Sequence, residues 1–270
     1  MLAVGATNPA HKVAGLNAAW SEADHFTLLM YDLCGRSDYE WSEGIVATLD
    51  LGIVGPAQSD DLYHFTGRVG SRPAAVPQEI QHMTPQERLN NILTEGQLRA
   101  FPPFGAVTPC VCFSESPPAH LSHLIGLGRF QPWGIVVSRY GVLDLGGGSV
   151  AYVPEAVHAQ FREAGLEHWS VRTGTDSAWM HEREWRLPRT DGYVSIRSVR
   201  AILVGDPTWR PSLVEAAWVD GSTGEPLPGP NGNPFAQPIM DLPRLWRESE
   251  IWVWDAQRQS VNSYPPGALS

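Results

Sequence analysis

The sequence predicts an α+β fold, in which a mixed, mainly antiparallel sheet carries several short helices. Short β-prone runs bounded by glycine and proline recur along the 270 residues, and the helical patterns between them are brief. The strand and helix order is too irregular for a doubly wound sheet, and no internal repeat or heptad pattern is present. With 43% hydrophobic residues, the chain can bury a substantial core.

The first strand-helix unit is the best marked. Residues 63–66, Tyr-His-Phe-Thr, form a β-prone run that predicts the first core strand. A helix is predicted over residues 84–95, because Thr84 is a favourable N-cap, a proline follows it, and Glu87 completes a capping box. Gly96 supplies the left-handed residue that ends this helix.

The later elements are predicted by similar patterns. Strands are expected at residues 110–115, 133–139, 150–153, 182–187, 199–205 and 251–254. Two more short helices are expected, one capped by Ser116 and Pro117 and one that Pro154 opens and that runs to about Glu163.

Charge divides the chain into three parts. Residues 1–60 hold two basic and eight acidic groups and form an acidic flank, with one helix predicted at residues 16–33. Residues 61–210 hold fourteen of each sign and form the predicted core. Residues 211–270 hold three basic and seven acidic groups. Within them, residues 221–238 are dense in glycine and proline and predict a long loop or linker, after which the last strand is expected to pack on the core. The neutral core argues against a general electrostatic grip on nucleic acid.

Cysteine usage and hydropathy predict a cytoplasmic protein with no membrane partner. No apolar run approaches the ~20 residues that cross a bilayer, and the N-terminus lacks the pattern of a secretion signal. Cys34, Cys110 and Cys112 cannot all pair, which suits reduced thiols. Cys110 and Cys112 with His120 and His123 also suggest a zinc site, but the spacing matches no known finger, so we expect core packing and no metal.

Two polar residues in predicted strands are candidate site residues. In the strand around Glu184, period-two alternation puts Glu182, Glu184 and Arg186 on one face. Trp185 lies on the other face. These carboxylates either form a solvated edge with an internal Glu184 to Arg186 pair or serve a site. His64 is likewise either a hydrogen-bonded strand residue or a functional one.

Four segments in order carry a resemblance to a known family: Tyr63-His64-Phe65-Thr66, Ile92-Leu93-Thr94-Glu95-Gly96-Gln97-Leu98, Val111-Cys112-Phe113-Ser114 and Glu184-Trp185-Arg186-Leu187-Pro188. Their order resembles the DarT-like group of ADP-ribosyltransferases. In that group a histidine opens the first strand, an Ile-Leu-x-x-Gly-Leu helix follows, and a catalytic glutamate precedes a short apolar strand ending in proline. Residues 111–117 and 133–153 are also similar to abortive-infection proteins of the AbiGi type, and the resemblance covers roughly residues 61–206.

The resemblance implies an ADP-ribosyltransferase-like fold that uses NAD. It implies that Glu184 is the catalytic carboxylate and that His64 contacts the NAD ribose. A carboxylate suits this chemistry, because breaking the nicotinamide to ribose bond builds positive charge on the sugar. The family's further catalytic arginine has no assigned position, since residues 99–108 hold only Arg99.

Position near the predicted strand ends suggests the remaining cofactor contacts. Arg68 or Arg72 is expected to hold the pyrophosphate, and Tyr152 or Trp133 to stack on a ring. Tyr63 and Thr66 flank His64 and complete the expected cofactor site.

Three functions follow as hypotheses. The first is an NAD-dependent ADP-ribosyltransferase of phage defence or a toxin-antitoxin system, which modifies a nucleic acid or protein and has a cognate antitoxin or defence partner. The second is a non-catalytic defence or antitoxin module that binds a partner on the same scaffold, which the unassigned arginine favours. The third is a metal-dependent nuclease that uses the outward carboxylates.

Overall fold

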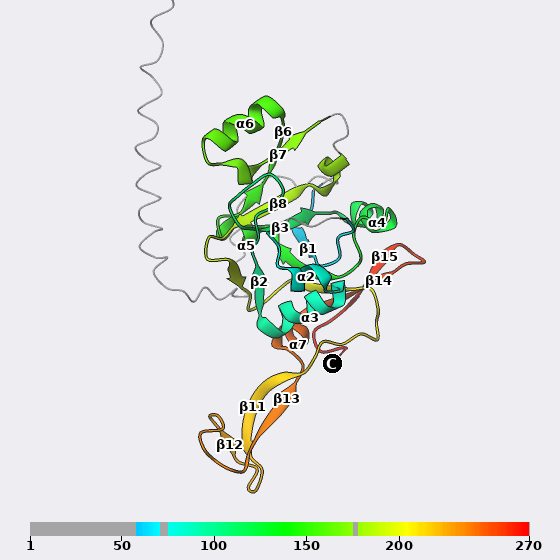
Figure 1. The fold of residues 1–270 in the computed structure, drawn as a ribbon. Coiled ribbons are helices and arrows are strands. Elements are labelled where there is room, and N and C mark those ends of the chain that lie inside the picture. The colour runs from blue at the N-terminus through cyan, green and yellow to red at the C-terminus, as the bar shows by residue number, and fades with distance from the viewer. Residues whose placement is uncertain (1–57, 71–74, 175–177, 270) are drawn as a thin grey trace, which may run out of the picture. The chain divides into compact units, whose positions relative to one another are not determined.

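An eight-stranded mixed sheet forms the centre of the protein in the computed structural model, which describes residues 58–70, 75–174 and 178–269 (Figure 1). Its strand order is β15-β14-β10-β4-β1-β3-β8-β5, and only β10 and β14 pair in parallel. The strands are β1 (Asp61–Phe65), β3 (Cys110–Glu115), β4 (Gly134–Ser138), β5 (Gly148–Ser149), β8 (Glu184–Pro188), β10 (Ala201–Val204), β14 (Glu250–Asp255) and β15 (Ser260–Tyr264). The prediction of a mixed, mainly antiparallel sheet with short helices is therefore confirmed.

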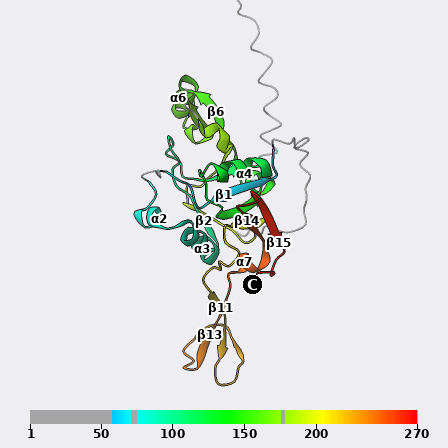
Figure 2. The same ribbon diagram turned by 90° about the vertical axis from the view of Figure 1, so that its right-hand side faces the viewer.

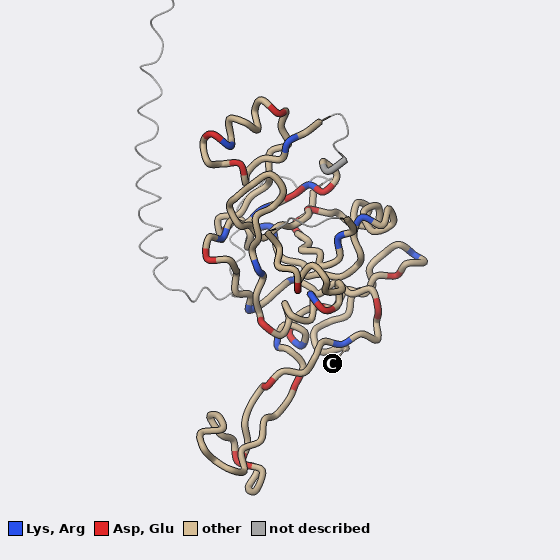
Figure 3. The backbone as a smooth tube through the Cα atoms, in the orientation of Figure 1, with Lys and Arg blue, Asp and Glu red and all other residues tan. Residues whose placement is uncertain are grey.

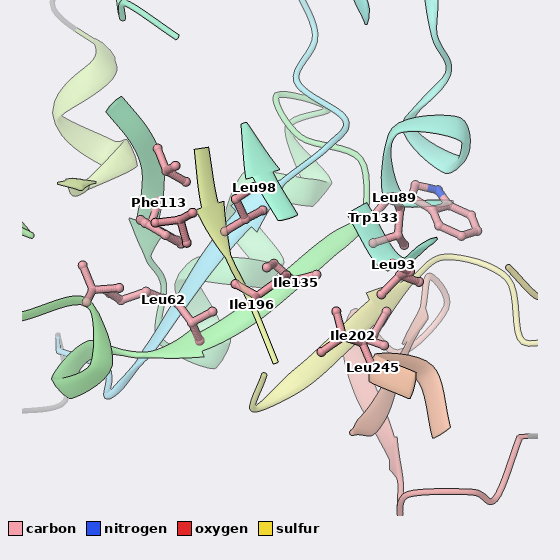
Figure 4. Packing of buried hydrophobic residues seen from close by; sticks show 14 of the residues in the cluster. Leu62, Leu89, Leu93, Leu98, Phe113, Trp133, Ile135, Ile196, Ile202 and Leu245 are labelled. Carbon is pink, nitrogen blue, oxygen red and sulfur yellow. The ribbon is translucent and has the colours of Figure 1, made fainter. Parts of the chain in front are cut away.

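Short helices cover both faces of this sheet. They are α2 (Gln78–His82), α3 (Pro85–Glu95), α4 (Pro118–Gly126), α5 (Arg139–Asp144), α6 (Glu155–Glu163) and α7 (Arg244–Glu248), with 3-10 turns η1 (Glu167–Trp169) and η2 (Ala178–Glu182). Leu89 and Leu93 of α3 and Leu245 of α7 pack with Leu62 and Ile202 on one face (Figure 4). On the other face, α4 packs through Leu121 against a smaller cluster of buried residues that includes Tyr63 and Val136.

The capping box of α3 forms as predicted. The Thr84 hydroxyl accepts from the Glu87 amide at 3.2 Å, and the Glu87 carboxylate accepts from the Thr84 amide at 2.7 Å. Gly96 ends the helix with φ of +63°. These bonds satisfy amides that a helix start leaves without partners, which is why a local pattern located this element so well.

One local prediction is wrong, and one helix has no counterpart among the predicted elements. Ser116 does not cap α4, because Pro117 occupies the cap position and the Ser116 hydroxyl lies 3.0 Å from that of Ser114. Helix α5 was not predicted. It starts directly after β4, where the Ser138 hydroxyl accepts from the Gly141 amide at 3.0 Å, and its six residues are too few to show a helical period.

Two small sheets accompany the main one. The predicted strand at residues 150–153 is present as β6 (Ala151–Pro154), and Pro154 precedes α6 as predicted. However, β6 pairs in parallel with β7 (Ser170–Thr173) outside the main sheet, so β6, α6 and β7 form a unit of their own. Strands β2 (Gln97–Arg99) and β9 (Tyr193–Ser195) form the other pair.

The predicted loop or linker at residues 221–238 contains strands instead. A three-stranded antiparallel sheet joins β11 (Val214–Asp220), β12 (Pro226–Leu227) and β13 (Ala236–Asp241), and it projects from the main sheet in both views (Figures 1 and 2). The glycines and prolines that indicated a linker form the turns between these strands and occupy strand positions at its edges, which fits the place of proline in sheets.

The last predicted strand packs on the core as expected, because β14 lies between β10 and β15 in the main sheet. The helix predicted at residues 16–33, and nearly all of the acidic flank, lie outside the described residues. Basic and acidic positions are interspersed along the described core (Figure 3). Among the described residues, no helix has the length and apolar character needed to cross a membrane.

Candidate functional site

A cavity opens where strands β1 and β3 part. Strand β1 pairs with β4 over five positions but with β3 at only two, which end at the pair Tyr63 and Ser114. Beyond this pair, the contact between the two strands is made by a side chain. The Nδ1 of His64 lies 2.9 Å from the Cys112 carbonyl. Since a carbonyl only accepts, Nδ1 carries the hydrogen of this bond. A cavity of about 900 Å³ is lined by residues of both strands, His64 and Cys112 among them.

Glu184 lines the same cavity from β8, on the far side of β3. Its backbone is fixed on both sides: the Glu184 amide donates to the Tyr152 hydroxyl at 2.8 Å, and its carbonyl accepts from the Val150 amide at 3.0 Å. The preceding residue, Arg183, has φ of +45°, a left-handed conformation that is unfavourable for a residue with a side chain. The turn before Glu184 is thus held in one unusual conformation.

The carboxylate of Glu184 forms a two-pronged pair with Arg186. The Arg186 Nε and Nη2 donate to its two oxygens at 2.9 and 3.2 Å. The Arg186 side chain is 2% exposed, and its Nη1 donates to the carbonyls of His168 at 2.9 Å and Ser170 at 3.5 Å. Burial acts to lower the pKa of Arg186, but the charge of Glu184, its hydrogen bonds and the two nearby cysteines together outweigh burial, and the pKa is raised. The predicted pair is therefore present, but its arginine is buried and its carboxylate is partly exposed beside a cavity rather than on a solvated edge.

A second pair, between Glu182 and Arg68, also lines the cavity. Their side chains meet at 2.8 Å, and those side chains are 10% and 39% exposed respectively. Burial raises the pKa of Glu182, while the Arg68 guanidinium acts in the opposite direction. Arg68 also lies over the Phe130 ring, 5.9 Å from its centroid. As predicted, Trp185 and Leu187 enter the core, so the alternating side chains of Glu184 and Arg186 point away from it.

The rest of the lining is basic and aromatic. The charged lining residues are Arg68, Arg99, Arg162, Arg172, Arg186, Glu182 and Glu184, which makes five arginines to two glutamates. The ring-bearing lining residues are Tyr63, His64, Phe65, Phe101, Phe104, Phe113, Phe130 and His158. Such a lining suits an anionic ligand that also carries flat rings.

The structure brings some of the predicted cofactor residues together. Tyr63, His64 and Arg68 line the cavity with Glu184. Thr66 does not, because its buried hydroxyl lies 2.9 Å from the Pro85 carbonyl, which holds α3 against β1. Arg72 lies outside the described residues.

The two predicted stacking residues lie elsewhere. Trp133 is buried in the core, where its ring meets Trp209 edge to face at 5.4 Å. Tyr152 is outside the cavity lining and contacts the Glu184 backbone instead, and burial raises the pKa of its hydroxyl to about 12. Tyr152 thus supports the candidate carboxylate from behind.

Several lining residues were missed by the sequence analysis. Phe101 and Phe104 come from the turn after β2, and His158, Arg162 and Arg172 come from the unit formed by β6, α6 and β7. No local pattern marks them, because only the packing of that unit beside β8 places them at the cavity.

The suggested zinc ligands do not form a metal site. Cys110 and Cys112 line the cavity, whereas the rings of His120 and His123 on α4 lie close to each other, with centroids 6.1 Å apart. Within the part of the chain that the structure describes, no group of three or more histidine, cysteine, aspartate or glutamate side chains is arranged to hold a metal ion. Burial, followed by the Glu184 charge, raises the pKa of Cys112 well above its usual value, which favours the protonated thiol.

Comparison with known proteins finds no relative. No protein-family model matches the chain, and no curated protein or solved structure matches it.

Proposed function

We propose that the cavity binds NAD and that the protein is an ADP-ribosyltransferase, with Glu184 as its catalytic carboxylate. One observation carries this proposal: His64 and Glu184 line the same cavity, although a third strand lies between theirs. The volume of about 900 Å³ lies near the upper end of the range for cofactor sites.

The Glu184 carboxylate has the capacity that this role requires. A carboxylate offers about four lone-pair positions, and the two bonds from Arg186 occupy two of them. The others can accept hydrogen bonds from ribose hydroxyls. Because Arg186 is itself fixed by backbone carbonyls, Glu184 meets the sugar in a set orientation, which is the condition for electrostatic stabilisation without reorganisation.

The reaction is then a substitution at the ribose carbon. The bond from C1′ to the nicotinamide nitrogen breaks, and its electron pair leaves with nicotinamide. Positive charge develops on the sugar beside Glu184, as it does in glycoside hydrolysis. The acceptor forms a bond to C1′ and gives up its proton, so that ADP-ribose is transferred.

The arginines of the lining provide for the pyrophosphate. Arg68 lines the cavity, and one of its terminal nitrogens contacts Glu182. Arg162 and Arg172 also line the cavity, and both form ion pairs with the exposed Glu155. A guanidinium group has five N–H donors and can bind two phosphate oxygens at once. An arginine that forms one ion pair therefore keeps donors for a ligand. The resemblance to DarT-like enzymes suggests phage defence or a toxin-antitoxin system as the setting, with a nucleic acid or a protein as acceptor.

The test is Glu184→Gln, which keeps the shape and removes the charge. We expect nicotinamide release from NAD to fall by about 10²- to 10³-fold, since a charge that stabilises the transition state is lost. NAD binding measured by calorimetry should persist. The matched control is Glu248→Gln, which removes an exposed glutamate paired with Arg244 on α7 and should leave turnover unchanged. Equal turnover in Glu184→Gln and the wild type would refute the mechanism.

A non-catalytic module is the second candidate, and the pair with Arg186 favours it. Because both Glu184 oxygens already bind a buried arginine, the pair by itself accounts for the position of Glu184. On this alternative the wild type binds an anionic partner at the cavity but releases no nicotinamide from NAD. Incubation of the wild type with labelled NAD separates the two candidates.

A further inference from the structure

Glu115 is a buried charge that lines no part of the cavity, yet it contacts both neighbours of Glu184. It ends β3 and its residue is 6% exposed; because Ser114 is the register partner of Glu184, the next residue, Glu115, lies on the opposite face of the sheet. One carboxylate oxygen lies 3.1 Å from the Arg183 guanidinium. The other accepts from the Trp185 indole N–H at 3.0 Å. The Glu115 side chain therefore contacts the residues on both sides of the candidate catalytic carboxylate.

The backbone strengthens these contacts. The Glu115 amide donates to the Arg183 carbonyl at 3.1 Å, so Glu115 holds Arg183 through its backbone and its side chain at once. Arg183 has φ of +45°, and a residue stays in such a conformation only when its surroundings impose it. Glu115 is also anchored at the start of β1, because the Ser59 amide donates to it at 3.0 Å.

We infer that Glu115 is a positioning residue, which fixes the strained turn at Arg183 and so aims Glu184 into the cavity. This inference rests on the function proposed above. Glu115 contacts the side chains of Arg183 and Trp185, which flank Glu184, so fixing these two residues sets the direction of the residue between them. Displacing a catalytic group by about 1 Å can cost roughly 10²-fold in rate. The contacts of Glu115 are therefore expected to affect turnover more than NAD binding.

The kinetic test compares Glu115→Gln, Arg183→Met and the double variant. We expect each single change to lower kcat for nicotinamide release by about 10- to 100-fold, while Kd for NAD stays within about twofold. If Glu115 acts through Arg183, the double variant should be little worse than the more damaging single one. Additive losses, or a wild-type kcat in Glu115→Gln, would overturn the inference.

A destabilised control separates positioning from stability. Leu245→Ala removes a buried core side chain on α7, away from β3 and β8, and should lower the melting temperature while leaving kcat at the wild-type value where the protein is folded. Glu115→Gln should lower kcat at that same temperature. If both variants lose stability and neither loses kcat, Glu115 is structural only and the inference fails.

A measurement without NAD keeps this inference distinct from the proposed function. The buried Arg186 Nε–H, bonded to Glu184, should give a protected signal in NMR hydrogen exchange. We expect Glu115→Gln to speed its exchange by about tenfold or more, and Leu245→Ala to leave it unchanged. Unchanged exchange in Glu115→Gln would refute the positioning role. A wild type that releases no nicotinamide, but shows this change in exchange, would refute the proposed function alone.

Discussion

Charged groups behave differently in the cavity region and in the sheet of β11, β12 and β13. Beside the cavity, Glu184 and Arg186 have side chains 17% and 2% exposed, and each is the other's ionic partner. At the end of β11, Asp220 accepts hydrogen bonds from Ser222 and from Asn233 in turns close to water. Removing a partner in the first region leaves a charge that is largely shielded from water, whereas in the second region water can replace the partner. The same kinds of contact therefore orient a site in one place and shape a turn in the other.

The largest difference is expected from removing Arg186. Arg186→Met leaves the Glu184 carboxylate without its buried partner, and breaking such a pair typically costs about 3–5 kcal/mol of unfolding free energy. Urea denaturation measures this loss. The matched variant Arg244→Met breaks an exposed pair on α7 and should cost no more than about 0.5 kcal/mol. Equal losses of unfolding free energy in the two variants would show that the pair of Glu184 and Arg186 contributes no more to stability than an exposed pair.

Glu182 gives an effect of intermediate size that depends on pH. Burial raises its pKa in the folded protein above the usual 4.5. A carboxyl whose pKa is raised on folding adds stability that is present below its unfolded pKa and is lost as the pH rises through the folded value. Glu182→Gln stays uncharged, so it should gain stability relative to the wild type as the pH rises from 4.5 toward neutral.

Thermal unfolding of Glu182→Gln and the wild type across this range measures the effect. The control Glu225→Gln lies at an exposed position before β12 and should keep a constant difference from the wild type. If Glu182→Gln also shows a constant difference, its burial in the cavity wall does not set its charge state.

The smallest effect is expected in the sheet of β11, β12 and β13. Hydrogen bonds from Ser222, then from Asn233, lower the pKa of Asp220 to about 2. A carboxyl with a lowered pKa adds stability that is present above pH 3.8 and is lost as the pH falls toward 2. Asp220→Ala should therefore speed amide hydrogen exchange in β11 and β13 at neutral pH, while the NAD binding proposed for the cavity is expected to stay unchanged. A change in NAD binding would contradict the independence of the two regions.

The sequence predicts elements best where a local pattern and the final contacts agree. The capping box at Thr84 forms the bonds that its residue types require, and alternation around Glu184 correctly separates Trp185 in the core from the carboxylate. The sheet of residues 214–241 was missed because its prolines and glycines indicate turns, and its strands lack the buried alternation that predicts a half-buried strand.

The site was predictable only in part for a similar reason. His64 and Glu184 stand out in their own strands, but their meeting depends on the early end of pairing between β1 and β3, which no residue type reports. The contributions of His158 and Arg172 depend on how one small unit packs beside β8. Glu115, at the end of a predicted strand, has a charge whose role is visible only through its contacts with Arg183 and Trp185.

The parallel pairing of β10 with β14 has a consequence for synthesis on the ribosome. When residues 201–204 leave the exit tunnel, the edge of β10 is without its partner until residues 250–255 have also emerged. An open strand edge is a template for pairing with other chains, so this interval is the time of greatest exposure to aggregation. A nascent chain stalled between these segments should engage chaperones more strongly than one stalled after residue 264.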